Sequence, residues 1–131
     1  MRVVLTVGGS GRALAETIRG LLQAQAEGVA REIQGGRALP LLYHSGVRYK
    51  PEATRGSGVE YFDDPWTVLK RGHGDCDDLV LWRCAEILAQ RIHAGVICKW
   101  RLPRYHVAVR KADGSAEDPS KKLIQLYGRQ R

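Results

Sequence analysis

The hydrophobic positions of this chain follow a helical period in two segments. Between residues 13 and 33, apolar side chains recur every three or four residues, which predicts a long amphipathic helix that ends at Gly35-Gly36. Its apolar positions are Leu14, Ile18, Leu21 or Leu22, Ala26 and Val29. A second helix is predicted from residue 76 to about residue 92, with Asp75 as its N-cap and Asp78 placed to complete a reciprocal cap. Its buried stripe would comprise Leu81, Ala85, Leu88 and Ile92.

Alternating polar and apolar residues predict short strands elsewhere. Residues 2 to 7 form one such run, followed by a flexible break at residues 8 to 11, and residues 96 to 102 and 105 to 111 form two more. Along the run from residue 105, one face carries Tyr105, Val107 and Val109, and the other carries His106, Ala108 and Arg110. Asp113-Gly114 is a hairpin signal that leads into a short last strand.

These elements predict one α+β domain that covers residues 1 to 131. We expect the second helix to pack on a small antiparallel sheet, with the long N-terminal helix beside them. The stretch from residue 46 to residue 64, which contains glycines and a proline, is expected to be extended or looped.

Composition and charge narrow the class of protein. A chain of 131 residues with 44% hydrophobic content forms one modest core, and no apolar run is long enough to span a bilayer or to act as a signal peptide. Three irregularly spaced cysteines do not make a disulfide framework, so we expect a reducing, cytoplasmic environment. The net charge of +7 is spread along the chain, with a small cluster at Lys121, Lys122, Arg129 and Arg131. Because no aromatic residues are interleaved with these charges, we favour solubility and a basic tail over nucleic-acid binding.

Three short segments carry the candidate chemistry. Gly74-Asp75-Cys76-Asp77-Asp78-Leu79 places a thiol at the start of the second predicted helix, where unpaired N–H groups and the helix dipole favour the thiolate. The neighbouring aspartates, which we expect at the surface, oppose this only weakly, so a close imidazole should decide the outcome. His106 and Asp118 follow in the order of base and orienting carboxylate. The position of Cys76 among aspartates also predicts that its side chain is not deeply buried.

Gly-Asp-Cys-Asp-Asp at residues 74–78, His-Val-Ala-Val at residues 106–109 and Asp-Pro-Ser at residues 118–120 together resemble the transglutaminase-like cysteine peptidases, a papain-like family. The likeness covers roughly residues 40 to 122 and is greatest to the short members found in bacteria and bacteriophages. It implies a triad in which Cys76 attacks a carbonyl carbon, His106 takes and returns the proton, and Asp118 fixes the imidazole tautomer.

From this resemblance we expect a cysteine hydrolase, a peptidase or amidase, that acts through a thioester acyl-enzyme. The partner would be a peptide or protein substrate, with cell-wall peptides, phage structural proteins and host proteins all open. Two alternatives stand beside this reading. The chain could be a transamidating acyltransferase of the transglutaminase type, or a phage structural or assembly protein that keeps the fold with little turnover.

The length of the hairpin loop decides whether Asp118 can reach His106. With a two-residue turn at Asp113-Gly114, Asp118 would lie on the face away from His106, and Glu117 would take the catalytic side. With a three-residue loop over residues 112–114, Asp118 returns to the face of His106. Such a loop suits a glycine in the left-handed conformation. Since the family pattern is aspartate followed by proline, we predict the three-residue loop or an equivalent bulge.

Other polar side chains are candidates for contacts with the substrate or the oxyanion. The backbone N–H of Cys76 should be one oxyanion donor. Trp66, His73 and the more distant Gln34 are candidates for a second donor. For Trp66 we favour a packing role as a core or cleft-wall aromatic.

The remaining cysteines and a glycine-rich turn suggest no further chemistry. Cys84, within the body of the predicted helix, and Cys98, within a strand, are expected to be inert core thiols. His73 and Cys76 could form half of a zinc site, but no second pair of ligands accompanies them. The turn at residues 8–11 lacks the third glycine of a dinucleotide-binding fingerprint. We therefore expect no metal and no cofactor, and the oligomeric state stays open.

Overall fold

The computed structural model describes residues 2–6, 11–51, 59–101 and 104–128, which form a mixed α and β structure. The helices are α1 (Arg12–Gln34), the short η1 (Leu42–His44), α2 (Pro65–Arg71), α3 (Cys76–Ala89) and α4 (Pro119–Tyr127). The strands are β1 (Arg2–Thr6), β2 (Arg48–Tyr49), β3 (Val59–Asp63), β4 (His73–Gly74), β5 (Ala94–Arg101), β6 (Arg104–Lys111) and β7 (Ala116–Glu117). Most of the predicted glycine break at residues 8–11, and Arg129 and Arg131 of the basic cluster, lie outside the described residues.

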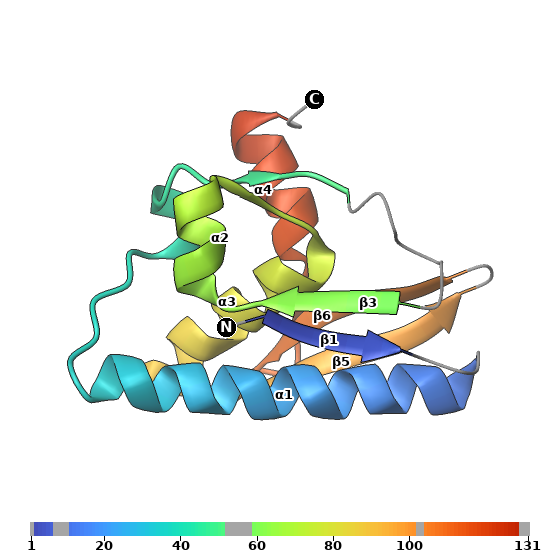
Figure 1. The fold of residues 1–131 in the computed structure, drawn as a ribbon. Coiled ribbons are helices and arrows are strands. Elements are labelled where there is room, and N and C mark those ends of the chain that lie inside the picture. Colours follow the sequence, from blue (N-terminus) through green and yellow to red (C-terminus); the bar gives the residue numbers. More distant parts are fainter. Residues whose placement is uncertain (1, 7–10, 52–58, 102–103, 129–131) are drawn as a thin grey trace.

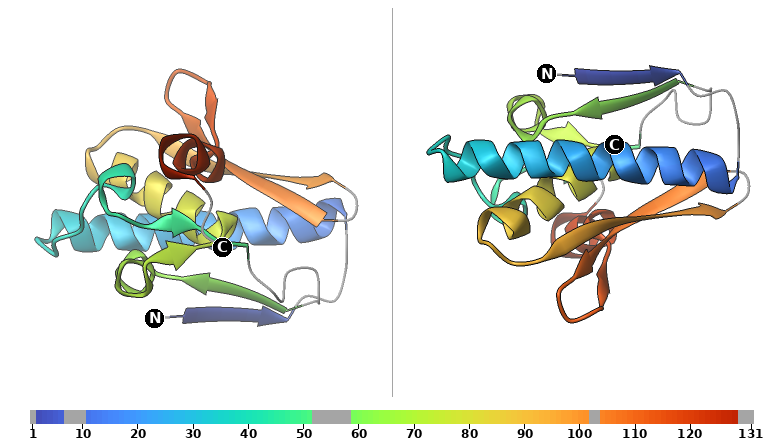
Figure 2. Two further views of the ribbon diagram at one scale, coloured as in Figure 1. Left: turned by 90° about the horizontal axis from the view of Figure 1, so that it is seen from above. Right: turned by 90° about the horizontal axis from the view of Figure 1, so that it is seen from below.

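The strands form three small sheets around α3. β5, β6 and β7 make a three-stranded antiparallel sheet in that order, β1 pairs antiparallel with β3, and β2 pairs parallel with β4. Figure 2 shows the β1–β3 pair on one side of α1 and the three-stranded sheet on the other. The predicted packing of the second helix on a small antiparallel sheet is confirmed, because α3 contacts both β5 and β6.

The long helix α1 agrees with its prediction to within one residue at each end. Its buried face carries Ala15, Ile18, Leu22, Ala26, Val29 and Ala30. This face packs on α3 and along β5, the edge strand of the three-stranded sheet (Figure 1). The side-chain oxygen of Gln23 accepts a hydrogen bond from the backbone N–H of Val96 at 2.7 Å, so a helical side chain partners one outward-facing backbone group of that edge.

The helix α3 begins as predicted and ends earlier. Asp75 accepts a hydrogen bond from the N–H of Asp78, and the Asp78 side chain accepts one from the N–H of Asp75, which completes the reciprocal cap. The helix stops at Ala89, and Arg91 adopts a positive φ of 63°. The predicted extension to residue 92 is therefore wrong, and Ile92 is 46% exposed.

The prediction of a single buried stripe on α3 is also wrong, because this helix is buried on nearly all sides. One hydrophobic cluster fills the space between α1, α3 and the three-stranded sheet. A second cluster, which contains Trp82, lies where α3 meets α2, η1 and α4. A helix between two clusters needs apolar residues all round, so its sequence shows little amphipathic contrast.

The hairpin between β6 and β7 has the predicted three-residue loop. Val109 pairs with Glu117, and the backbone N–H of Lys111 donates to the carbonyl of Ser115 at 2.8 Å. Gly114 takes the left-handed conformation with φ of 86°. This register places Asp118, one residue beyond β7, on the same face of the sheet as His106.

Candidate active site

His106 and Asp118 are in contact. His106 Nε2 lies 3.0 Å from Asp118 Oδ2. The other carboxylate oxygen of Asp118 accepts the backbone N–H of Lys121 at 3.2 Å, so Asp118 is also the N-cap of α4. One carboxylate therefore joins the end of the hairpin, the start of a helix and the imidazole. With Nε2 directed at Asp118, Nδ1 is the ring nitrogen that is left to accept a proton.

The electrostatics of this pair favour a charged carboxylate. Burial by itself raises the pKa of Asp118, but hydrogen bonds from His106 and from the N–H of Lys121 outweigh burial and hold the pKa below its ordinary value. Asp118 is thus ionised at neutral pH and can orient the imidazole. The His106 side chain is 45% exposed, so it is open to a substrate.

Cys76 is the first residue of α3, and it is only 5% exposed. The prediction that its side chain is not deeply buried is therefore wrong. The flanking aspartates are not surface groups either, because Asp75, Asp77 and Asp78 are all buried. Each of these three carboxylates turns into the structure, where it accepts hydrogen bonds from backbone or side-chain donors.

Asp77 links the helix that carries the thiol to the strand that carries the imidazole. Its side chain is completely buried, and Oδ2 accepts the hydroxyl of Tyr105 at 2.5 Å. Its Oδ1 lies 3.9 Å from the sulfur of Cys76, which is within reach of a weak S–H hydrogen bond. Because Asp77 follows Cys76 and Tyr105 precedes His106, this bond brings the start of α3 to the start of β6. Sequence reasoning missed it, although an inward-facing tyrosine on β6 was a usable signal.

The contacts of Asp78 hold neighbouring segments of the chain together. Its Oδ1 accepts the backbone N–H of Asp63 at 2.9 Å, and its Oδ2 lies 3.1 Å from an Nη atom of Arg71. Burial and the neighbouring Asp63 raise the pKa of Asp78 to about 6, although hydrogen bonds from the backbone act in the opposite direction. Gly74 is required by the same packing, since a Cβ there would lie 3.1 Å from the Cβ of Asp78 and from a methyl group of Val68.

A second network lies behind the hairpin. Glu117 accepts hydrogen bonds from the Tyr43 hydroxyl and from Arg83 Nε, the latter at 2.6 Å. Arg83 also binds Glu86 at 2.8 Å, and Glu86 accepts the backbone N–H of Leu42. Burial alone would raise the pKa of Glu117, but the bonds from Arg83 and Tyr43 lower it below its usual value. Glu117 therefore faces away from the imidazole and fastens β7 to α3.

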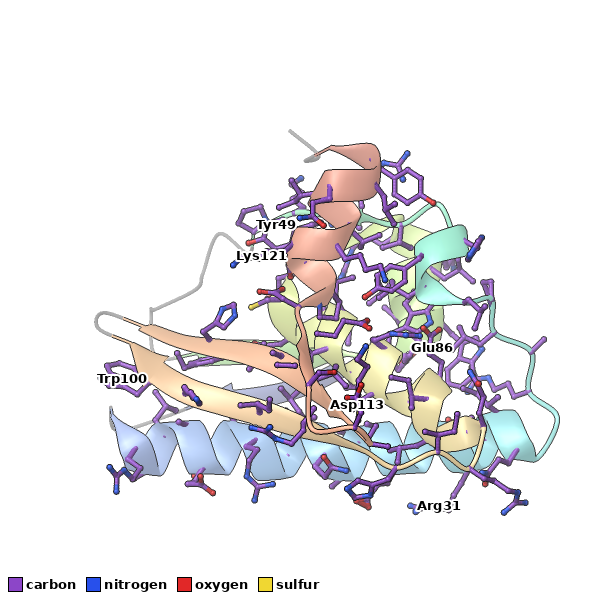
Figure 3. The ribbon with its side chains drawn as sticks, turned by 180° about the vertical axis from the view of Figure 1, so that it is seen from behind. Arg31, Tyr49, Glu86, Trp100, Asp113 and Lys121 are labelled. Carbon is purple, nitrogen blue, oxygen red and sulfur yellow. The ribbon has the colours of Figure 1, made fainter. Side chains whose placement is uncertain are left out.

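A cavity of about 250 Å³ opens beside the His106–Asp118 pair. His106, Asp118, Lys99, Arg110 and Lys121 contribute its polar lining. Cys76 is not among the described residues that line it, which agrees with the low exposure of the thiol. In Figure 3, Lys121 on α4 and Tyr49 on β2 lie above the three-stranded sheet.

The candidates for a second oxyanion donor are not equally placed. The indole N–H of Trp66 donates to the carbonyl of Ala38 at 2.8 Å, and the Arg37 guanidinium stacks 3.6 Å from its ring. Trp66 is thus committed to packing, the role that we favour from the sequence. Gln34 donates to the carbonyl of Ala89, the last residue of α3. The length of α3 puts Gln34 about 20 Å from Cys76, which removes it as a candidate.

His73 lies in β4, paired with Arg48, three residues before Cys76. Burial and the nearby cations Arg71 and Lys50 lower the pKa of His73, so this imidazole is neutral at physiological pH. A neutral ring retains one N–H donor, and His73 therefore stays a candidate for a contact with the substrate.

The other two cysteines are buried as predicted. Cys84 is completely buried, and burial together with the charge of Glu27 raises the pKa of this thiol to about 12. Cys98 is 7% exposed in β5. At neutral pH Cys84 is protonated, which makes it a poor nucleophile.

Among the described residues, no group of three or more histidine, cysteine, aspartate or glutamate side chains is arranged to hold a metal ion. Likewise, none of the described helices is both long enough and apolar enough to cross a membrane. A scan against models of protein families, a search of curated proteins and a search of solved structures each found no match to this chain.

Proposed function

We propose that this chain is a cysteine hydrolase that cleaves peptide or amide bonds, with Cys76 as nucleophile, His106 as general base and Asp118 as orienting carboxylate. The observation that carries the proposal is the 3.0 Å contact between His106 Nε2 and Asp118 Oδ2. It exists because the three-residue loop returns Asp118 to the face of His106, and because Glu117 is held elsewhere. Thiol acyl transfer requires a histidine that is oriented by a carboxylate and set beside a cysteine. Asp118 orients His106, and the hydrogen bond from Tyr105 to Asp77 joins the strand that carries His106 to the helix start that carries Cys76.

The proposed reaction has two halves. In the first, His106 Nδ1 takes the proton of Cys76, the sulfur attacks the carbonyl carbon, and the leaving amine receives that proton as the C–N bond breaks. In the second, water gives a proton to His106, attacks the thioester and releases the carboxylic acid as the C–S bond breaks, and His106 returns its proton to the departing Cys76 sulfur. Cys76 is the first residue of α3, and its backbone N–H is the donor that we propose for the oxyanion.

The resemblance to transglutaminase-like cysteine peptidases supports the same proposal at the level of fold. A helix with a cysteine at its start, packed on an antiparallel sheet that carries the histidine, is what that papain-like core would contain. Transamidation is the nearest alternative, because an amine can resolve the same thioester in place of water. An assembly protein with little turnover is the other alternative.

Thiol reactivity tests the proposal without a known substrate. Competitive labelling with iodoacetamide near neutral pH, followed by mass spectrometry, should modify Cys76 faster than Cys84 or Cys98, because Cys76 lies at a helix start, where the dipole favours the thiolate. His106→Ala should slow the labelling of Cys76 by about tenfold or more, whereas the matched change His93→Ala at an exposed histidine should leave it unchanged.

Faster labelling of Cys84 or Cys98, or a rate at Cys76 that ignores His106→Ala, would disprove the assignment of the nucleophile. Once a cleaved peptide is found, adding a primary amine separates the two enzymatic readings. Hydrolysis gives a free acid at the new terminus, and transamidation gives the amide of the added amine.

A further inference from the structure

Two cavities adjoin each other along the edge of the three-stranded sheet. The larger, of about 710 Å³, lies between the N-terminal half of α1 and β5, and it extends to Trp100. The smaller is the cavity beside His106 and Asp118. Ile97, Lys99 and Arg110 line both cavities, so the two are neighbours, and together their lining leads away from the candidate active site. We call this surface the β5 groove.

The charge of the β5 groove is strongly one-sided. Its cations are Arg12, Arg19, Lys99, Arg110 and Lys121. Its two carboxylates, Glu16 and Asp118, are both engaged, the first with Arg19 at 3.3 Å and the second with His106. Among the described residues, no carboxylate lies within ion-pair distance of Lys99 or Arg12. The groove therefore presents positive charge that the described part of the chain does not neutralise.

The register of the sheet relates these cations to the catalytic pair. Lys99 lies directly opposite His106 on the neighbouring strand, so both side chains project from the same face. Arg110 is four residues beyond His106 on that face, about 14 Å along the strand. Lys121 stands in the first turn of α4, three residues after Asp118. Positive charge thus surrounds the imidazole on two strands and a helix.

We propose that the β5 groove binds an acidic segment of a peptide substrate, and that Lys99, Arg110 and Lys121 select glutamate or aspartate side chains within about four residues of the scissile bond. This inference rests on the proposed hydrolase function and names its substrate class. The carboxylates of an extended peptide would meet Lys99 next to His106 and Arg110 further along β6. The opposite charges favour association, and they do so most at low ionic strength.

A nucleic acid would also be attracted by positive charge, but the lining of the groove fits a peptide better. Of the described residues that line the two cavities, Trp100 is the only aromatic ring in the larger one and His106 the only one in the smaller. Proteins that bind single strands usually stack successive bases on several aromatic side chains. The catalytic pair at one end of the groove, moreover, acts on acyl groups, which a peptide contains and a nucleic acid backbone does not.

Binding is tested first, with turnover removed. The probes are three fluorescein-labelled peptides of about eight residues that are rich in glutamate, glutamine or lysine, and the protein carries Cys76→Ala. Fluorescence anisotropy at low salt should give a Kd for the glutamate peptide at least about tenfold below that for the glutamine peptide. The difference should shrink as the salt concentration rises.

Variants locate the binding on the groove. Lys99→Gln and Arg110→Gln should each weaken the glutamate peptide about two- to fivefold, and Lys99→Glu should weaken it further. Lys70→Gln and Arg31→Gln remove the same charge at residues that line neither cavity, and they should leave the Kd unchanged. Figure 3 shows Arg31 and Trp100 at opposite ends of α1. Melting curves for every variant confirm that the fold is kept.

Two results would overturn the proposal. Equal weakening by Lys70→Gln and Lys99→Gln would mean that net charge alone attracts the peptide. Tighter binding of a single-stranded oligonucleotide of equal charge, lost on Lys99→Gln, would make the groove a nucleic-acid surface. The labelling of Cys76 keeps the two hypotheses distinct. A reactive thiol without a preference for acidic peptides refutes only the substrate class, and an inert thiol with that preference refutes only the hydrolase.

Discussion

Glu117 and Asp118 are adjacent carboxylates with different partners. Glu117 binds Arg83 and holds β7 to α3, whereas Asp118 contacts His106. We predict that Glu117→Gln lowers the stability of the fold and leaves the reactivity of Cys76 nearly unchanged. Asp118→Ser should leave the stability of the fold nearly unchanged and lower the reactivity of Cys76. Serine is as good an N-cap as aspartate, so α4 keeps its first hydrogen bond, but its side chain is too short to reach His106.

The size of the Glu117 effect follows from its surroundings. The side chain is 9% exposed, and it accepts Arg83 Nε at 2.6 Å. Breaking a buried ion pair costs about 3–5 kcal/mol when one charge is left without a partner. Arg83 retains Glu86 at 2.8 Å, which reduces the expected loss to about 2–3 kcal/mol. For a domain of this size, such a loss lowers Tm by about 10 °C.

The pH dependence of this loss has a definite sign. Because the pKa of Glu117 in the folded chain lies below its usual 4.5, the carboxylate stabilises the fold at pH values above 4.5. That contribution disappears as the pH falls through the lowered pKa. The difference in unfolding free energy between wild type and Glu117→Gln should therefore be largest at neutral pH and should vanish in acid. Urea unfolding at a series of pH values measures it.

The second measurement on the same two variants is the rate at which Cys76 is alkylated. Asp118→Ser should slow the alkylation of Cys76 by about tenfold or more, because the imidazole loses its orienting partner. Its unfolding free energy should change by less than about 1 kcal/mol. If Glu117→Gln slowed labelling more than Asp118→Ser, Glu117 rather than Asp118 would serve the imidazole, and the argument from the hairpin register would be refuted.

Two further substitutions test the structural residues near the site. Asp78→Asn should break the reciprocal cap and lower Tm, at a cost of about 0.5–2 kcal/mol in unfolding free energy. It should not slow the labelling of Cys76 in the folded protein. Slower labelling at an unchanged Tm would show that Asp78 has a chemical role. Because the pKa of Asp78 is raised to about 6, wild type should also lose stability as the pH rises through 6, and this variant should lack that slope. Gly114→Ala should lower the free energy of unfolding by about 1 kcal/mol, because Gly114 has a φ of 86°. Gly20→Ala, a control in open space within α1, should raise the free energy of unfolding by about 0.5–1 kcal/mol. Equal effects of the two changes in urea unfolding would contradict the assigned turn.

The predictions that succeeded depend on local chemistry. The extent of α1, the reciprocal cap at Asp75 and the faces of β6 follow from the spacing of apolar and capping residues within a few positions. The three-residue loop also follows locally, since it needs only a glycine able to adopt positive φ. The contact between His106 and Asp118 is a direct consequence of that loop.

Two helices that the sequence reasoning did not predict begin with a signal that was present. Both α2 and α4 start at a proline preceded by an aspartate, Asp64 in one and Asp118 in the other, and each aspartate caps its helix. Asp-Pro is a start signal of the same kind as Asp75, but Asp118-Pro119 is interpreted from the sequence only as part of the candidate site, and Asp64-Pro65 is not interpreted at all.

The burial of Asp77 and Asp78 could not be predicted, because each accepts a hydrogen bond from a distant part of the chain. Asp77 accepts its hydrogen bond from Tyr105, 28 residues later, and Asp78 accepts one from the N–H of Asp63, 15 residues earlier. A sequence shows the charge of such a residue but not the donor that will meet it after folding. The inference that charged neighbours keep a cysteine at the surface fails for this reason.

The contacts of α1, η1 and α4 have a consequence for how the chain folds. Gln23 meets Val96 across 73 residues, Tyr43 meets Glu117 across 74, and Tyr127 meets the carbonyl of Tyr43 across 84. Contacts between residues so far apart in the chain slow folding, because long loops must close before these interactions can form. On the ribosome, α1 would emerge early and stay without its docking surface until α3 and then β5 have been synthesised. His106 and Asp118 come late in the chain, so their contact would form after α1 and α3 have been synthesised.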